Sequence, residues 1–114
     1  MDQKSAWIYC RIDAPEDTHG ALKGQYERLE TYAAQMGFVV VGSSQDLGSG
    51  LNFDRSGLQA VLEEAEAGDF QVLLVDSVSR IGRDTEKVQA VINLLQDCSV
   101  QIYSPLEGKL DRAF

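Results

Sequence analysis

Arginine is the residue type whose placement in this chain predicts chemistry. Arg11, Arg55, Arg80 and Arg83 each stand beside a predicted strand end or helix start. A guanidinium group donates a planar fork of hydrogen bonds that matches the oxygens of a phosphate group. Several such groups at one edge of a fold would bind an anion with several oxygens. The alternative is that each arginine pairs separately with one of the 18 acidic residues, on the surface.

The elements that must position these arginines follow from the pattern of apolar residues. Continuous apolar runs predict strands over residues 6–12, 38–42, 70–75 and 100–103. Apolar residues at helical spacing predict helices over residues 21–36, 58–65 and 88–95. We therefore expect an α/β fold with three layers, in which a mainly parallel sheet of four to five strands carries helices on both faces.

The carboxyl edge of this sheet is the predicted place of the functional site, because loops converge there in parallel sheets. Arg11 and Asp13 end the first predicted strand, Asp46 follows the second, and Arg80 follows the third. Carboxyl ends of parallel strands share one edge. We therefore expect these side chains to meet in one place.

Three segments carry further structural expectations. Residues 38–42 are β-branched and continuous, so we expect this strand to be central or nearly central in the sheet. Residues 43–54 are rich in glycine and serine and predict a mobile loop. Residues 105–114 hold only scattered apolar side chains, and we predict no firm structure for them. Asp84 is a predicted helix N-cap.

The composition fits a single globular domain over residues 1–114, with 44% hydrophobic and 25% charged residues. No apolar run approaches the roughly 18 to 20 residues of a membrane span, so we expect a cytoplasmic protein without a membrane partner. The net charge of −8 argues against broad attraction to nucleic acid. Any role in DNA binding must therefore depend on a local site.

Metal and cofactor chemistry is not predicted. Cys10 and Cys98 lack the clustered spacing of a zinc site, and we expect both to be reduced. His19 has no second histidine or neighbouring cysteine, so we expect it to be a surface residue rather than a metal ligand. Trp7 and Tyr9 alternate along the first strand and are expected to pack in the core.

Five short segments stand out in order along the chain: YCRID at 9–13, Gln25 with Leu29, DLGSG at 46–50, DRSGL at 54–58 and SRIGRD at 79–84. In this order they resemble the motifs of the resolvase/invertase family of serine recombinases. The resemblance covers about residues 6–104, and its most specific part is the double-arginine segment SRIGRD. A flavodoxin-like small-molecule binder that shares only the architecture is a weaker hypothesis, because it does not account for this segment.

The resemblance implies the catalytic domain of a site-specific DNA recombinase, in which a serine hydroxyl attacks a DNA phosphodiester and forms a phosphoserine link. It implies DNA as a partner, through the full-length protein or a partner subunit, and a homo- or hetero-oligomer of recombinase subunits. The resemblance implies that the four arginines bind the phosphate and that Gln25 positions the nucleophile or an arginine. It implies that Asp46 and Ser49 orient the loop that delivers Arg55, and that Gly50 and Gly57 supply backbone freedom. Ser79, where many resolvases have aspartate, would form local hydrogen bonds.

Asp13 stands at the position of the family's nucleophilic serine. A carboxylate is repelled by the phosphate that it must attack, and we expect it to pair with Arg11 or a neighbouring arginine. Its attack would give an acyl phosphate, which is prone to hydrolysis. Ser5 precedes the strand and Thr18 lies in the following loop, so neither replaces the missing hydroxyl.

Two hypotheses about function follow from this replacement, and whether the chain is an enzyme stays open between them. The first is a recombinase catalytic domain whose strand cleavage and exchange are impaired. The alternative is a non-catalytic interaction or regulatory module that docks onto active recombinase subunits. The sequence ends before the family's long dimerisation helix and C-terminal DNA-binding domain, so we expect either a part of a longer protein or a small stand-alone relative.

Overall fold

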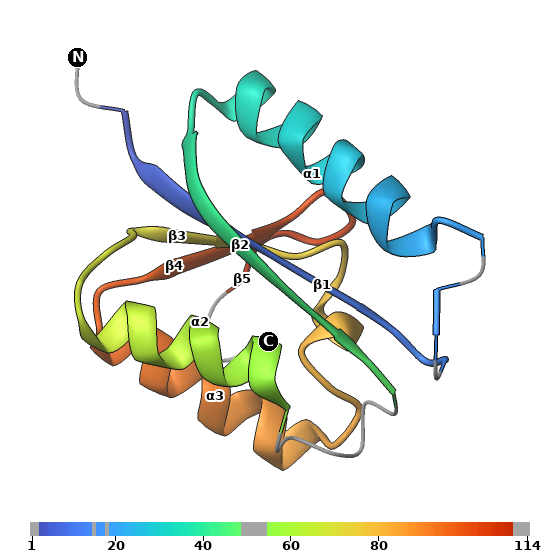
Figure 1. The fold of residues 1–114 in the computed structure, drawn as a ribbon. Helices are drawn as coiled ribbons and strands as arrows, with labels where there is room; N and C mark the ends of the chain where they lie inside the picture. Colours follow the sequence, from blue (N-terminus) through green and yellow to red (C-terminus); the bar gives the residue numbers. More distant parts are fainter. Residues whose placement is uncertain (1–2, 15, 18, 49–54, 111–114) are drawn as a thin grey trace.

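The structure is a computed structural model that describes residues 3–14, 16–17, 19–48 and 55–110. Along the chain these residues form β1 (Ser5–Ile12), α1 (Ala21–Met36), β2 (Val39–Leu47), α2 (Ser56–Glu66), β3 (Val72–Leu74), the short 3-10 helix η1 (Val78–Arg80), α3 (Thr85–Asp97), β4 (Gln101–Ser104) and β5 (Gly108–Leu110). Figure 1 shows α1 on one face of the sheet and α2 and α3 on the other. The expected three-layer α/β fold is therefore confirmed.

The five strands form one sheet in the order β2-β1-β3-β4-β5. The pairs β1–β2, β1–β3 and β3–β4 are parallel, and β5 is antiparallel to β4. The carboxyl ends of the four parallel strands consequently lie at the same edge. No helix in the described part of the chain is long and apolar enough to cross a membrane.

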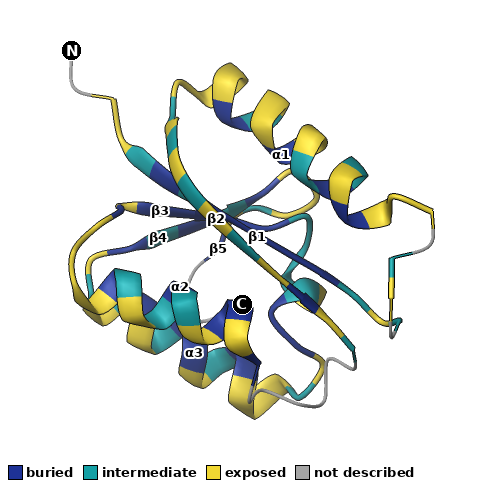
Figure 2. Ribbon diagram, in the orientation of Figure 1, coloured by how far each residue is buried: buried dark blue, intermediate teal, exposed yellow. Residues whose placement is uncertain are grey.

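The strand β1 supplies side chains to both hydrophobic cores of the domain. Tyr9 packs on the side of α2 and α3, whereas Ile8 and Cys10 pack on the side of α1. This alternation follows from the two-residue period of a strand whose faces are both covered. Figure 2 shows the buried residues gathered along β1 and β3 and on the inner sides of the helices.

The expectation that residues 38–42 form a central strand is wrong, because β2 lies at the edge of the sheet and pairs only with β1. The strand also continues to Leu47, through residues that the sequence predicts to be loop. An edge strand has one side open to water and accepts polar residues such as Ser43 and Gln45, which are both exposed. The segment from residue 49 to residue 54 lies outside the described residues.

The C-terminal segment also departs from the sequence-based expectation. Residues 108–110 form β5, where Gly108 pairs with Ser104 and Leu110 with Ile102. Leu110 is buried against the core on the side of α2 and α3. A single buried leucine in a charged stretch gives no periodic signal, which is why the sequence does not predict this strand.

The start of α2 is held tightly against the end of β2, and Gly57 makes this approach possible. A Cβ atom at this position would lie 2.5 Å from the carbonyl oxygen of Gln45 and 2.8 Å from Oδ2 of Asp46. Both distances are shorter than van der Waals contact. Gly57 is thus required for close packing inside a helix, rather than for the backbone freedom expected from the sequence.

We predict that Gly57→Ala lowers the free energy of unfolding by about 1–3 kcal/mol, because the added methyl group forces α2 away from β2. Gly24→Ala is the matched control, since its Cβ would meet only the end of Arg28, at 3.5 Å. An alanine in this open helical position should raise the stability by about 0.5–1 kcal/mol. Urea denaturation followed by circular dichroism measures both changes, and equal stabilities of the two variants would contradict the close-packing argument.

Candidate active site

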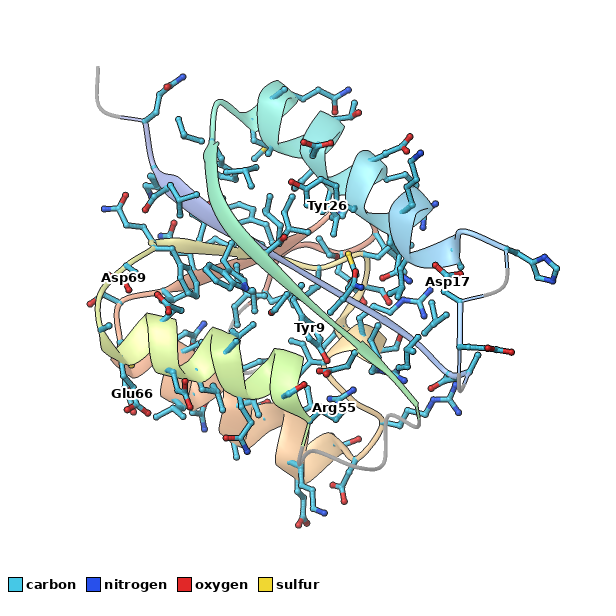
Figure 3. All side chains as sticks on the ribbon, in the orientation of Figure 1. Tyr9, Asp17, Tyr26, Arg55, Glu66 and Asp69 are labelled. Atoms are coloured by element: carbon cyan, nitrogen blue, oxygen red, sulfur yellow. The ribbon has the colours of Figure 1, made fainter. Side chains whose placement is uncertain are left out.

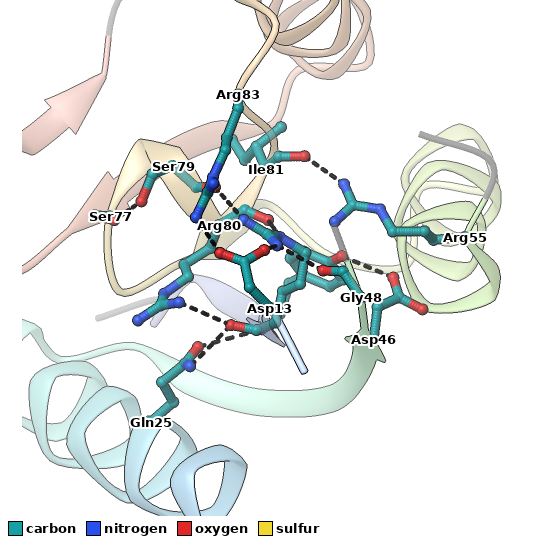
Figure 4. A network of polar contacts seen from close by, with 12 residues as sticks. Asp13, Gln25, Asp46, Gly48, Arg55, Ser77, Ser79, Arg80, Ile81 and Arg83 are labelled. Atoms are coloured by element: carbon teal, nitrogen blue, oxygen red, sulfur yellow. Dashed lines mark hydrogen bonds and ion pairs between the residues drawn. The ribbon is translucent and has the colours of Figure 1, made fainter. Parts of the chain in front are cut away.

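The ends of β1 and β2 and the short helix η1 bring together most of the residues that the sequence singles out (Figure 4). Arg11 is the penultimate residue of β1, Arg80 ends η1, and Arg83 follows η1. Asp13 lies between Arg11 and Arg83. We call Arg11, Asp13, Arg80 and Arg83 the arginine site. Ser49, which the resemblance also implicates, lies outside the described residues.

Arg11 is the most deeply buried member of the arginine site, with 1% of its surface exposed. Its guanidinium group donates hydrogen bonds to the carbonyl oxygens of Gly48 at 2.8 Å, Ser79 at 2.7 Å and Arg80 at 3.0 Å. These carbonyls belong to the segments that follow β2 and β3. Arg11 therefore ties three parts of the sheet edge together.

Gln25, on α1, fixes the backbone of Arg11. The amide nitrogen of Arg11 donates to Oε1 of Gln25 at 3.2 Å, and Nε2 of Gln25 donates to the carbonyl oxygen of Arg11 at 2.9 Å. Gln25 is 1% exposed, so these bonds are formed away from water. In this structure Gln25 thus contacts the backbone that carries Asp13, a contact suited to a positioning role.

Asp13 forms ion pairs with two members of the arginine site. Its Oδ1 pairs with Arg11 and its Oδ2 with Arg83. This agrees with the expectation that a carboxylate at this position pairs with Arg11 or a neighbouring arginine. The side chains of Asp13 and Arg83 are 34% and 57% exposed, so this pair can be reached from the solvent.

Arg80 faces a different set of partners. Its NH1 group donates to the carbonyl oxygen of Arg11 at 3.0 Å, and its NH2 group lies 3.9 Å from Oδ2 of Asp76. The hydroxyl groups of Ser77 and Ser79 in the same turn are 2.7 Å apart and share a hydrogen bond. The hydroxyl of Ser79 therefore bonds within its own turn, while its carbonyl oxygen accepts a hydrogen bond from Arg11.

Arg55 lies at the start of α2 (Figure 3). Only 6% of its surface is exposed. Its guanidinium group donates to the carbonyl oxygen of Ile81 and lies over the ring of Tyr9, 5.9 Å from the ring centre. This is a cation–π contact. Burial is the main reason why the pKa of Arg55 is lowered from its ordinary value.

Asp46, near the end of β2, serves as the cap of α2. Its side chain accepts hydrogen bonds from the backbone nitrogens of Gly57 at 2.8 Å and Leu58 at 2.9 Å. It also accepts a hydrogen bond from the hydroxyl of Tyr9 at 2.7 Å. A carboxylate is favoured at a helix N-terminus because the first backbone N–H groups lack partners within the helix. Asp46 therefore fixes the helix that begins directly after Arg55.

Tyr9 is a polar member of this region that the sequence reasoning missed, because its alternation with Trp7 indicated packing only. Burial raises its pKa far above the ordinary value, and the hydrogen bond to Asp46 adds to this effect. The polar role of Tyr9 could have been predicted on physical grounds, because a buried tyrosine hydroxyl usually has a hydrogen-bond partner. Two further charged residues were not predicted from the sequence to lie near the site. Asp76 forms an ion pair with Arg28 and also lies close to Arg80.

Of the two hydroxyl residues considered as substitutes for the missing nucleophile, only Ser5 lies in the described part of the chain, and it is far from Asp13. Ser5 begins β1, at the opposite end of the strand. Thr18 lies outside the described residues. Burial raises the pKa of Cys10 to about 11, so its thiol stays protonated near neutral pH. Among the described residues, no group of three His, Cys, Asp or Glu side chains could hold a metal ion.

Comparisons with known proteins bear on the family and the fold of the chain. The family model of the resolvase N-terminal domain matches residues 6–113. The N-terminal catalytic domain of TP901-1 integrase is 24% identical with a TM-score of 0.81, and the match covers 92% of this chain and 79% of that one.

Two further solved structures show the same similarity. The C-terminal catalytic domain of ISC1926 TnpA, an IS607-like serine recombinase, is 29% identical with a TM-score of 0.81, and the match covers 88% of this chain and 69% of that one. A resolvase family site-specific recombinase from Streptococcus pneumoniae is 21% identical with a TM-score of 0.79, covering 93% and 74%.

We predict that Asp46→Asn lowers the free energy of unfolding by about 2 kcal/mol, because one amide oxygen must replace a carboxylate that accepts three hydrogen bonds. Tyr9→Phe should cost about 1 kcal/mol. The double variant should lose less than the sum, since the two side chains share one bond. Chemical denaturation of the four proteins measures this coupling, and strictly additive losses would show that the bond between Tyr9 and Asp46 contributes nothing.

Proposed function

This chain belongs to the serine recombinase family, as a catalytic domain of the resolvase type, and we propose that Asp13 impairs its DNA strand cleavage. The observation that carries the proposal is the pairing of Asp13 with both Arg11 and Arg83. Asp13, in the YCRID segment, occupies the position at which the family has its nucleophilic serine. The proposal has a chemical part and an electrostatic part.

The chemical part concerns the product that would form if Asp13 attacked the phosphate. When a serine oxygen attacks the DNA phosphorus, it loses its proton, the bond from phosphorus to the 3′ oxygen breaks, and a phosphoserine ester and a free 3′ hydroxyl result. A 3′ hydroxyl of a new DNA end can then attack the ester and release the serine. A carboxylate that attacked would form an acyl phosphate instead, which water hydrolyses readily. In addition, both carboxylate oxygens of Asp13 already accept charge-assisted bonds. Such bonds reduce the electron density available for attack.

The electrostatic part concerns the phosphate. Asp13 presents two oxygens to guanidinium groups in the way that a phosphate would. A DNA phosphate must therefore displace this carboxylate before Arg83 can donate to it, and it meets the negative charge of Asp13 on approach. Asp13 thus acts as an internal competitor of the substrate.

The four arginines divide into two roles in this proposal. Arg83 is 57% and Arg80 29% exposed, and these side chains are the candidate phosphate ligands. Arg11 and Arg55 are almost fully buried and donate to backbone carbonyls. We assign them, with Gln25, a positioning role. The positive charge of the site would act on the charge that develops on the phosphate during attack.

DNA binding by the isolated domain is expected to be weak. The net charge is −8, and phosphate-backbone affinity requires clustered cations. We therefore propose that the target DNA is held through other parts of a full-length protein or through a partner subunit. Assembly with recombinase subunits, as a homo- or hetero-oligomer, belongs to the same proposal.

A second candidate function is favoured by the same pairing of Asp13. A domain that keeps the family fold but neutralises its own arginine site could serve as a non-catalytic module that docks onto an active recombinase. Size-exclusion chromatography with an active recombinase separates this function from the first. A stable complex supports the docking function, and separate elution of the two proteins at micromolar concentrations would remove it.

We predict that Asp13→Ser restores covalent attachment to DNA. The variant should be joined to the DNA-binding segment of an active serine recombinase and incubated with that recombinase's target DNA. The serine oxygen can then form a phosphate ester, and a protein–DNA adduct should appear on a denaturing gel. Asp13→Ala is the control and should form none. If the unmodified chain gives as much adduct as Asp13→Ser, Asp13 does not impair cleavage.

We further predict that Asp13→Asn raises the affinity for inorganic phosphate about tenfold, which corresponds to about 1.4 kcal/mol. The change removes the competing carboxylate from Arg11 and Arg83. Glu66→Gln, at the end of α2, changes the net charge by the same amount on an exposed residue and should have little effect. Phosphate titrations followed by NMR measure both affinities. Equal affinities of the two variants would contradict the competitor role.

A further inference from the structure

Asp76, just after β3, contacts arginines from two different elements. Nε of Arg28, on α1, lies 3.4 Å from its Oδ1, and NH2 of Arg28 lies 3.0 Å from its Oδ2. NH2 of Arg80 lies 3.9 Å from the same Oδ2. Arg28 therefore engages both carboxylate oxygens of Asp76, whereas Arg80 lies beyond hydrogen-bond distance.

The surroundings of Arg80 leave it accessible to an anion. Together with Asp76, Ser77, Pro105 and Leu106, it lines an open hollow of about 490 Å³. Its side chain is 29% exposed, and that of Asp76 is 21% exposed. A phosphate oxygen that enters the hollow can approach the guanidinium of Arg80, but it meets Asp76 on the same wall.

Asp76 is thus a carboxylate for which two cations compete. The fork of Arg28 matches a carboxylate better than a single distant N–H group does, because two parallel bonds fix both the distance and the orientation. The hydrogen bond to Asp76 also raises the pKa of Arg28 above its ordinary value. While Arg28 holds Asp76, the guanidinium of Arg80 keeps donors that are not committed to this carboxylate.

We propose that Arg28 is a positioning residue of the arginine site: by holding Asp76, it keeps Arg80 available to phosphate. The inference rests on the proposed function, in which Arg80 is a phosphate ligand. Arg28 itself need not touch the phosphate, since its effect passes through Asp76. Without Arg28, Asp76 would turn to Arg80, form a direct ion pair with it and compete with the substrate.

Three variants give this inference a distinctive pattern of phosphate affinity. Arg28→Ala should lower the affinity for inorganic phosphate about threefold, an effect in the range of a partly exposed ion pair. Asp76→Asn should raise the affinity or leave it unchanged, because the competitor is gone. The double variant should match Asp76→Asn alone, since Arg28 then has no carboxylate to hold.

The titrations should be carried out in the Asp13→Asn chain, where the site is freed of its other carboxylate. Lys23→Ala is the matched control, because Lys23 lies on the same helix, is exposed and carries the same charge. It should change the affinity far less than Arg28→Ala. A second measurement, without phosphate, is the rate at which the Arg80 guanidinium hydrogens exchange with water. The exchange should slow in Arg28→Ala and should not slow when Asp76→Asn is also present.

Two outcomes would overturn the inference. One is a loss of phosphate affinity in Arg28→Ala that persists when Asp76 is replaced, because Arg28 would then act directly or through net charge. The other is an equal loss in Lys23→Ala. If the Asp13→Asn chain binds no phosphate, the assignment of Arg80 and Arg83 as phosphate ligands fails, and the exchange rates of Arg80 still report whether Arg28 controls the contact between Asp76 and Arg80.

Discussion

The buried guanidinium group of Arg11 is the interaction on which the rest of the site depends. A cation removed from water must be surrounded by acceptors, or its burial destabilises the fold. The acceptors are Asp13 and three backbone carbonyls, which belong to the segments after β2 and β3. Those segments must therefore close onto the end of β1 when the domain folds. Compensation of this charge, together with the burial of apolar residues such as Ile81, determines where the loops of the sheet edge lie.

The same constraint explains why the arginines are not equivalent. Arg11 and Arg55 are directed at backbone carbonyls inside the domain, where they hold segments together. Arg80 and Arg83 remain partly exposed, and each lies near a carboxylate, Asp76 in one case and Asp13 in the other. In the proposed function, these two aspartates set the availability of positive charge to a phosphate. Because the domain has a net charge of −8, positive charge is available to an anion only at local sites of this kind.

The sequence predicted the strands and helices where apolar periodicity was strong, as in β1 and α1, and the helix cap at Asp84. It failed where tertiary contacts replaced periodicity. The strand β2 extends through polar residues because β1 offers it hydrogen bonds as far as Leu47. The strand β5 forms because β4 presents a free edge, on which Leu110 can be buried. Neither cause is visible in a local window of residues.

The sequence by itself determined the family motifs, the α/β order and the presence of aspartate at the nucleophile position, since these depend only on residue identity and spacing along the chain. Only the tertiary structure decided which partner each charged group has. The contacts of Arg11 with Ser79 and of Asp46 with Gly57 and Tyr9 join residues far apart in the chain. Their geometry follows from sheet register and from burial, because a charged or polar group in the interior must bond to whatever the folded chain places beside it.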